Sequence, residues 1–189
     1  MSRAYRIQVS ESICRVIRAS DHVRTRLEIL QILPPEDIAI LLRKELEQHG
    51  FTPEGDQMVR ADGEARIMVE SATGTVTVKA ETDQEVSVQG TETGFSYAQQ
   101  GAEARKAKEA LRKQLQKNLA SQVEARQAEL QKALTDKLEA QLGDVRKELD
   151  QISNKVTAEA LKVKARQMGQ VKEITEDPQS GSLTIVVEV

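Results

Sequence analysis

The feature that most constrains the fold is a run of strong helix formers between Gly101 and Gln170. This segment is almost entirely Ala, Leu, Gln, Glu, Lys and Arg, the residue types that stabilise helices best. Its apolar residues recur at helical spacing. Several lie 11 residues apart, as Leu119 and Leu130 do, which keeps an apolar stripe nearly straight along one face. The segment therefore predicts a long amphipathic helical arm over residues 101–169.

Two arrangements of this arm are open from the sequence. One continuous helix of roughly 65 residues would reach about 100 Å. Alternatively, Gly143 ends one helix and Asp144 caps the next, which gives an antiparallel hairpin. The apolar spacing continues through Gly143, and this favours the single rod. A strict heptad seam occurs only from Leu142 to Val156, so the arm is coiled-coil-like rather than a long leucine zipper.

The first 100 residues predict a small β-rich head with one packed helix. Apolar alternation over residues 3–9 indicates a strand, and residues 13–18 and 23–30 indicate a hairpin that turns at residues 19–22. Pro34 and Pro35 open the helix, which carries an apolar stripe and stops at Gly50. Shorter strands are expected at residues 57–60, 65–70, 75–80 and 85–89, with turns at Asp62-Gly63 and Thr73-Gly74.

The C-terminal residues 171–189 predict a β-hairpin that turns at residues 177–181. Its second strand, residues 183–189, is nearly continuously apolar, as in a strand buried on both faces. Such a strand needs a sheet, and the head offers one. We therefore expect an α+β fold: residues 1–100 and 170–189 form a head that this hairpin closes, and residues 101–169 form a long helical insertion.

The apolar stripe of the arm is the strongest interaction signal. A helix this long cannot bury its stripe along its whole length against so small a head. Its distal part is expected to need a second helix, which is its own return arm, that of a second copy, or that of a partner protein. The predicted partner-binding residues are Leu130, Leu134, Leu138, Leu142, Val145, Leu149, Ile152 and Val156.

Charge is distributed unevenly along the chain. The segment from Gly101 to Gln170 holds 15 Lys and Arg against 10 Asp and Glu, and the rest of the chain holds 12 against 20. The cations crowd the first turns of the arm, where the helix dipole favours acids. This patch indicates either a docking surface for an acidic partner or phosphate backbone, or a solvated face. It comprises Arg105, Lys106, Lys108, Arg112, Lys113 and Lys117.

Catalytic chemistry has little support in the sequence. Cys14 and His22 could form a nucleophile pair, but a small strand cysteine and a turn histidine explain them as well. His49 is interpreted as a helix C-terminal cap beside Gly50. Isolated histidines and one cysteine give no metal-ligand spacing, and no glycine-rich loop carries the lysine of a phosphate-binding loop. We expect no enzyme activity, metal or cofactor.

Compartment and partner class follow from composition. No stretch approaches the ~18 to 20 apolar residues that a membrane span requires, and residues 1–9 carry no apolar segment typical of a secretory signal. With a single cysteine, the chain is expected in the cytoplasm. The arm has no aromatic residue for stacking on bases, so we expect a protein rather than a nucleic acid as the main partner.

The segment Ala160-Leu-Lys-Val-Lys-Ala-Arg-Gln-Met-Gly, continued to Glu-Asp-Pro-Gln-Ser-Gly-Ser-Leu-Thr-Ile-Val-Val-Glu-Val189, resembles the closing helix and hairpin of a bacterial accessory-protein family. That family belongs to ternary systems with FtsH-like ATPases, MoxR-type AAA+ ATPases and von Willebrand A domain proteins. The segment is more distantly similar to small conserved chloroplast and cyanobacterial open-reading-frame proteins.

The resemblance implies a non-catalytic accessory role beside an ATPase. We therefore predict an adaptor that binds a partner protein, such as an AAA+ ATPase or a von Willebrand A domain protein, or that self-associates through its arm. The alternatives are an enzyme with its site in the head, and a nucleic-acid-binding protein that uses the basic residues from Arg105 to Lys117.

Overall fold

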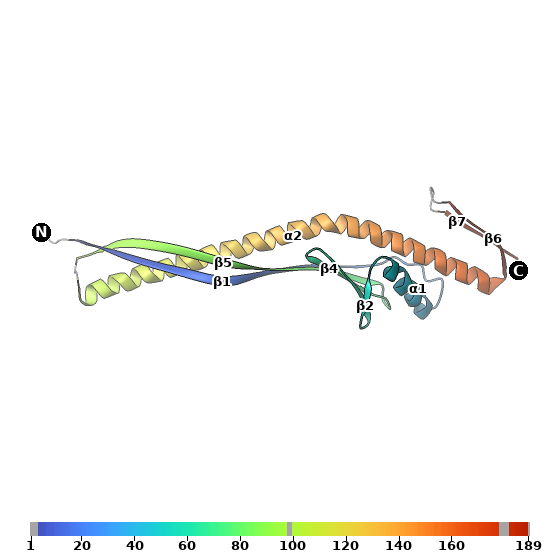
Figure 1. The fold of residues 1–189 in the computed structure, drawn as a ribbon, viewed down its shortest axis with the longest axis horizontal. Coiled ribbons are helices and arrows are strands. Elements are labelled where there is room, and N and C mark those ends of the chain that lie inside the picture. The colour runs from blue at the N-terminus through green and yellow to red at the C-terminus, as the bar shows by residue number, and fades with distance from the viewer. Residues whose placement is uncertain (1–3, 98–99, 178–181, 189) are drawn as a thin grey trace. The chain divides into compact units, whose positions relative to one another are not determined.

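The computed structural model describes residues 4–97, 100–177 and 182–188. It has a mixed α+β fold, as the sequence predicts (Figure 1). The elements, in chain order, are β1 (Tyr5–Arg26), α1 (Pro35–Gln48), β2 (Thr52–Glu54), β3 (Gln57–Asp62), β4 (Ala65–Glu70), β5 (Thr75–Ser96), α2 (Ala102–Met168), β6 (Gln170–Asp177) and β7 (Ser182–Glu188).

The described strands form two sheets. One has five strands in the order β1-β5-β4-β3-β2, and the other contains β6 and β7. The chain also divides into two compact units, and both contain part of α2. Unit 1 comprises Met1–Asp21 and Glu81–Asp136, and unit 2 comprises His22–Ala80 and Lys137–Val189.

Helix α2 runs without interruption from Ala102 to Met168. The single rod is therefore confirmed, and the alternative of a hairpin at Gly143 is wrong. Gly143 is exposed, and a Cβ added to it would meet nothing within 4 Å. Glycine lowers helix stability at such a position but does not break the backbone hydrogen bonding that neighbouring residues maintain.

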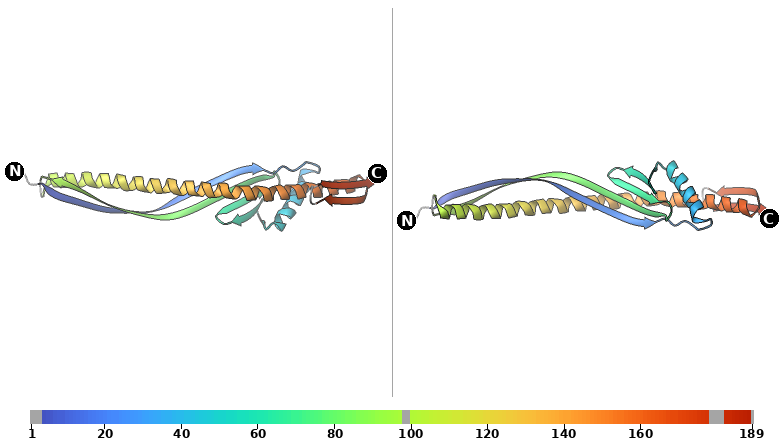
Figure 2. Two further views of the ribbon diagram at one scale, coloured as in Figure 1. Left: turned by 90° about the horizontal axis from the view of Figure 1, so that it is seen from above. Right: turned by 90° about the horizontal axis from the view of Figure 1, so that it is seen from below.

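In unit 1, β1 and β5 form a two-stranded ribbon that α2 follows on one face (Figure 2). The hydroxyl groups of Ser10 and Thr91 lie 2.9 Å apart across the ribbon. Buried side chains alternate along both strands, as the two-residue period of a strand requires. Ile17 on β1 and Val86 on β5 pack with Val123 of α2 in one apolar cluster.

Two glycines of β5 allow α2 to approach this ribbon closely. A Cβ at Gly90 would lie 2.7 Å from Leu115 Cδ1, and one at Gly94 would lie 2.9 Å from Leu111 Cδ1. The stripe of α2 is therefore covered in unit 1 by the sheet of its own chain. In unit 1 the burial of this stripe therefore needs no second helix, because the face of a sheet can cover it.

In unit 2, α1 and the strands β4 and β5 contribute fully buried apolar side chains. Leu42 and Leu46 of α1 are fully buried, as are Ile67 of β4 and Val76 of β5. Strands β2, β3, β4 and the start of β5 pair antiparallel. The predicted turns at Asp62-Gly63 and Thr73-Gly74 are confirmed, since Gly63 and Gly74 adopt φ of 61° and 70°.

Two expectations about the strands are wrong. Residues 13–18 and 23–30 do not form a hairpin, because β1 continues through residues 19–22 as one strand. Likewise, residues 75–80 and 85–89 belong to the single strand β5. The alternation remains in phase, with Ile17 and Ala19 both buried, so the polar residues that follow can occupy the exposed face of a strand.

The C-terminal hairpin is present, but it does not close the larger sheet. Among the described residues, β6 and β7 pair only with each other. Gly169 alone separates α2 from β6, so no connecting segment is available to carry the hairpin back to the other strands. Most of its predicted turn, residues 178–181, and the last residue, Val189, lie outside the described part of the chain.

Candidate partner-binding site at the start of α2

The predicted arm residues lie mostly inside the fold. Leu134, Leu138, Val145, Leu149, Ile152 and Val156 are buried, and Leu130 and Leu142 are half-buried. Leu130 packs against the cluster that contains Ile17 of β1. Since these side chains already have apolar neighbours in their own chain, burial gives no reason to expect a partner helix on them.

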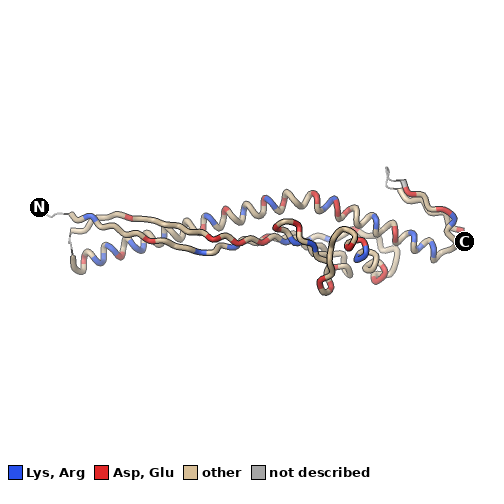
Figure 3. The backbone as a smooth tube through the Cα atoms, viewed as in Figure 1, with Lys and Arg blue, Asp and Glu red and all other residues tan. Residues whose placement is uncertain are grey.

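The predicted basic patch, in contrast, is exposed. All six residues are exposed and belong to unit 1: Arg105, Lys106, Lys108, Arg112, Lys113 and Lys117. Figure 3 marks the Lys and Arg positions along the backbone in blue. Gly101 leads into this part of α2 with φ of 102°, and its carbonyl oxygen accepts the first helical hydrogen bond, from the backbone N–H of Arg105 at 3.2 Å.

Ion pairs neutralise only part of this patch. Arg112 pairs with Glu11 of β1, and Lys113 pairs with Glu109 one turn earlier on α2, at 3.2 Å. The hydrogen bond from Gln116, helped by that from Arg112, lowers the pKa of the Glu11 carboxyl, which keeps Glu11 charged beside Arg112. Within the described part of the chain, no carboxylate forms an ion pair with Arg105, Lys106, Lys108 or Lys117.

The start of β1 and the first turns of α2, where Arg105 and Lys108 lie, together line a pocket. Its volume is about 590 Å³, and Arg6, Arg105 and Lys108 line it. Among the described residues that line the pocket, none is acidic. The other lining residues are Tyr5, Ile7, Gln8, Gln100, Gly101 and Ala104. Three cations therefore share one concave site at the positive end of a helix dipole, where a bound anion would relieve their mutual repulsion.

Aromatic residues gather at the same end of unit 1. Tyr5 lines the pocket, and Phe95 and Tyr97 at the end of β5 are 73% and 77% exposed. Ser10 contacts Thr91 and Cys14 contacts Glu85, so β1 and β5 run antiparallel and the end of β5 lies beside the start of β1. No local sequence pattern predicts that Arg6 or these aromatic residues belong to the site, because only the fold brings them near the start of α2.

The predicted nucleophile, Cys14, has a carboxylate as its hydrogen-bond partner. The Cys14 thiol donates a hydrogen bond to Glu85 Oε1 at 2.9 Å. This hydrogen bond, with desolvation and the negative charge of Glu85, raises the pKa of Cys14, which disfavours the reactive thiolate. His49 ends α1 as the C-cap residue, and its Nδ1 lies 3.1 Å from Glu148 Oε1.

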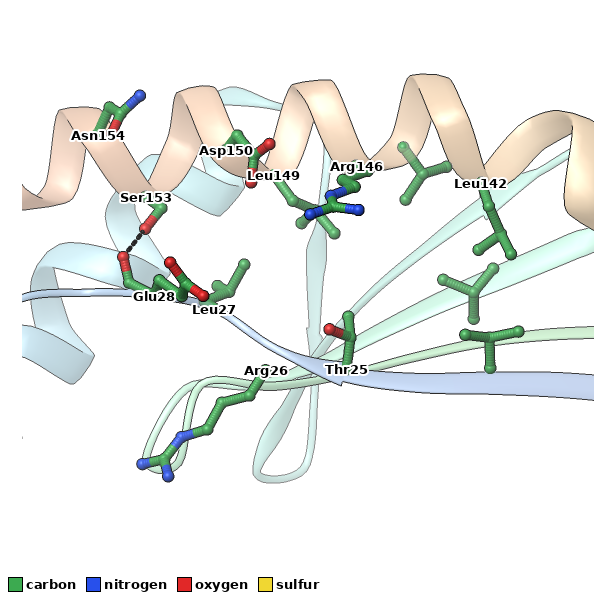
Figure 4. A pocket seen from close by; sticks show the side chains of 13 residues that line it. Thr25, Arg26, Leu27, Glu28, Leu142, Arg146, Leu149, Asp150, Ser153 and Asn154 are labelled. Atoms are coloured by element: carbon green, nitrogen blue, oxygen red, sulfur yellow. Dashed lines mark hydrogen bonds between the residues drawn. The ribbon is translucent and has the colours of Figure 1, made fainter.

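A second pocket, of about 660 Å³, lies within unit 2 between α2 and the strands β1 and β5 (Figure 4). Val78, Leu142 and Leu149 are among the apolar residues that line it. Its polar lining is of mixed sign, with Arg26 and Arg146 against Glu28 and Asp150. Because these charges balance, this pocket favours no class of charged ligand, unlike the pocket at the start of α2.

Comparison with known proteins shows the family. The family described as FtsH ternary system domain X5 matches residues 1–189. The chain belongs to this family. The first resemblance predicted from the C-terminal segment is thereby confirmed, while the similarity to the small chloroplast proteins is untested. No curated protein and no solved structure shows a significant match to the chain.

Two further properties bear on how an X5 chain could act. Among the described residues, no group of three or more His, Cys, Asp or Glu side chains could hold a metal ion. In the same residues, neither helix is long and apolar enough to cross a membrane.

Proposed function

We propose that the chain is a non-catalytic accessory protein of an FtsH ternary system, and that it binds an acidic segment of a partner protein at the pocket lined by Arg6, Arg105 and Lys108. Membership of the X5 family supports the accessory role. The observation that carries the proposed site is the concave cluster of three cations without a lining carboxylate.

Electrostatics support an acidic partner at this site. Lys and Arg in the first turn of a helix oppose its dipole, at a cost of about 0.3–1 kcal/mol each. A carboxylate-rich segment reverses that cost, and guanidinium groups bind carboxylates through paired hydrogen bonds. The proposed partners are the AAA+ ATPases and the von Willebrand A domain protein of the ternary system. The proposed compartment is the cytoplasm, since an exposed free cysteine such as Cys14 is typical of reducing conditions.

Binding to each purified component of the system tests this proposal. The full chain, its Arg105→Glu/Lys108→Glu variant and a control variant are compared by biolayer interferometry at 50 and 300 mM salt. We expect the double variant to lose about tenfold or more in affinity, mainly through a slower association rate that salt also suppresses. The control is Lys132→Glu, an exposed α2 residue of unit 1 outside the pocket. Equal binding by the double variant and the chain itself, or no binding to any component, would overturn the proposal.

A single-stranded nucleic acid is the second candidate ligand. Tyr5 in the pocket, with Phe95 on β5 and Tyr97 just after that strand, supplies the aromatic surface that the arm itself lacks. Stacking on aromatic side chains beside a basic groove is the usual mode of sequence-tolerant binding. A fluorescein-labelled 20-nucleotide strand tests this candidate by anisotropy. Binding that falls steeply with salt and is lost in Tyr5→Ala would favour nucleic acid over a protein partner.

A further inference from the structure

The C-terminal hairpin is a two-stranded sheet whose apolar residues its own chain covers only in part. Strands β6 and β7 pair over seven residue pairs, yet none of residues 170–176 and 182–188 is buried. Ile174 and Val186 are 37% and 44% exposed. An isolated two-stranded hairpin is marginally stable in water, whereas a sheet with more strands and an apolar face is stable. This hairpin therefore has a strong physical reason to acquire further strands.

Charge distinguishes the two strands of the hairpin. Strand β6 carries Lys172, Glu173 and Glu176, and such residues protect a sheet edge from pairing with another chain. Glu176 also pairs with Lys162 of α2, which ties β6 to the helix and raises the pKa of that lysine. Strand β7 has no charged residue from Ser182 to Val187. The unprotected edge is therefore that of β7.

The sequence of β7 is suited to pairing with itself. An antiparallel pair centred on Ile185 places Leu183 opposite Val187 of the second copy, and Thr184 opposite its Val186. Each of these cross-strand pairs is favourable or neutral, and no like charges face one another. Glu188, the charged residue of the strand, lies opposite Ser182 of the second copy.

We propose that two copies of this chain associate through β7, antiparallel about Ile185, and form a four-stranded sheet in the order β6-β7-β7-β6. The contact is isologous, as most homodimer contacts are. It uses residues of unit 2 that lie far along the chain from the basic pocket, so it goes beyond the proposed partner binding and is independent of it.

The molar mass of the full chain tests the association. Light scattering after size exclusion, at loading concentrations from 1 to 200 μM, is expected to give twice the 21.0 kDa of one chain at the upper end. Ile185→Lys places two ammonium groups directly opposite each other and should raise the dimer dissociation constant about tenfold or more. The matched control is Ile174→Lys, which alters the other member of the same hairpin pair and should leave the dimer intact.

Cross-linking tests the register. In a Cys14→Ser background, Ile185→Cys places two thiols at the proposed two-fold axis, where directly opposed Cα atoms lie about 4.5–5.5 Å apart, within the range for a disulfide. Mild oxidation should cross-link this variant and leave Val187→Cys monomeric on a denaturing gel. A monomer at 200 μM, a dimer insensitive to Ile185→Lys, or a dimer that Ile185→Cys does not cross-link would overturn the proposal. Because the Arg105→Glu/Lys108→Glu variant should still dimerise, the two proposals can fail separately.

Discussion

Arg60 of β3 donates two parallel hydrogen bonds to the carboxylate of Glu148 on α2, each 2.6 Å long. The guanidinium group also donates to the carbonyl oxygen of His49 at 2.8 Å and lies 4.6 Å from the ring centroid of Phe51. The side chains of Arg60 and Glu148 are 21% and 28% exposed, so water screens this ion pair less than it screens an ion pair at the surface. Within unit 2, the pair fixes α2 to both β3 and the end of α1.

Replacing Glu148 should therefore destabilise unit 2 in a pH-dependent way. The hydrogen bonds from Arg60 lower the pKa of Glu148 despite its partial burial, and His49 adds to this effect. A carboxyl with a lowered folded-state pKa stabilises the fold fully above its unfolded pKa, and that stabilisation is lost as the pH falls through the folded value. Glu148→Gln should lower the free energy of unfolding by about 2 kcal/mol at pH 7.

Urea unfolding at pH 7, 5, 4 and 3 measures this effect. The difference between the chain and Glu148→Gln should shrink as the pH falls from 5 to 3. Glu139→Gln is the matched control, because Glu139 is an exposed residue of the same helix within unit 2. A pH-independent difference would show that the charge of Glu148 is not what holds Arg60.

Gly143 provides a test of the continuous helix. It lies in the interior of α2, without a positive φ and with open space around its α-carbon. Gly143→Ala should stabilise the chain by about 0.8–1 kcal/mol, because alanine loses less backbone entropy in a helix. A left-handed glycine at a helical turn would instead make the alanine variant less stable. The shift in the urea midpoint at unchanged slope decides between these outcomes.

Gly90 should tolerate substitution poorly, because α2 approaches β5 so closely there. A Cβ at this position would lie 2.7 Å from Leu115 Cδ1 and 3.2 Å from Leu119 Cδ2. Gly90→Val should destabilise unit 1 by about 1–3 kcal/mol through overpacking, although valine is the better strand residue. Gln89→Val on the exposed neighbouring position should show no such loss. Equal stability of the two variants in urea would mean that α2 does not pack on Gly90.

The helices were the most predictable part of the fold. Composition alone sets the extent of α2, and Pro35 and Gly50 mark the two ends of α1 as expected. The element that covers the stripe of α2 was not predictable in the same way, since an amphipathic pattern does not specify whether its neighbour is a helix or a sheet. The spacing of Gly90 and Gly94 is a signal of close approach that could have indicated the sheet.

The candidate site was predictable only in part. The cations of the first turns of α2 are consecutive in sequence, so a count of charges finds them. Arg6 and Tyr5 reach the same pocket from β1, which is distant in sequence, and only the pairing of β1 with β5 beneath α2 places them there. The sequence does not reveal that β1 continues through residues 19–22, because polar residues on the exposed face of a ribbon resemble the residues of a turn.

Cys14 should react slowly with thiol reagents although it is exposed. Its thiol donates a hydrogen bond to Glu85, and this contact raises the pKa of Cys14, so less thiolate is present at a given pH than in an unstructured peptide. Alkylation by iodoacetamide at pH 8, followed by mass spectrometry, should be slower for the folded chain than for the urea-unfolded chain. Glu85→Gln removes the negative charge and should accelerate the reaction, whereas Glu92→Gln on the same strand should not. Reaction of the folded chain faster than the unfolded one would indicate an activated thiol and support the nucleophile reading of Cys14.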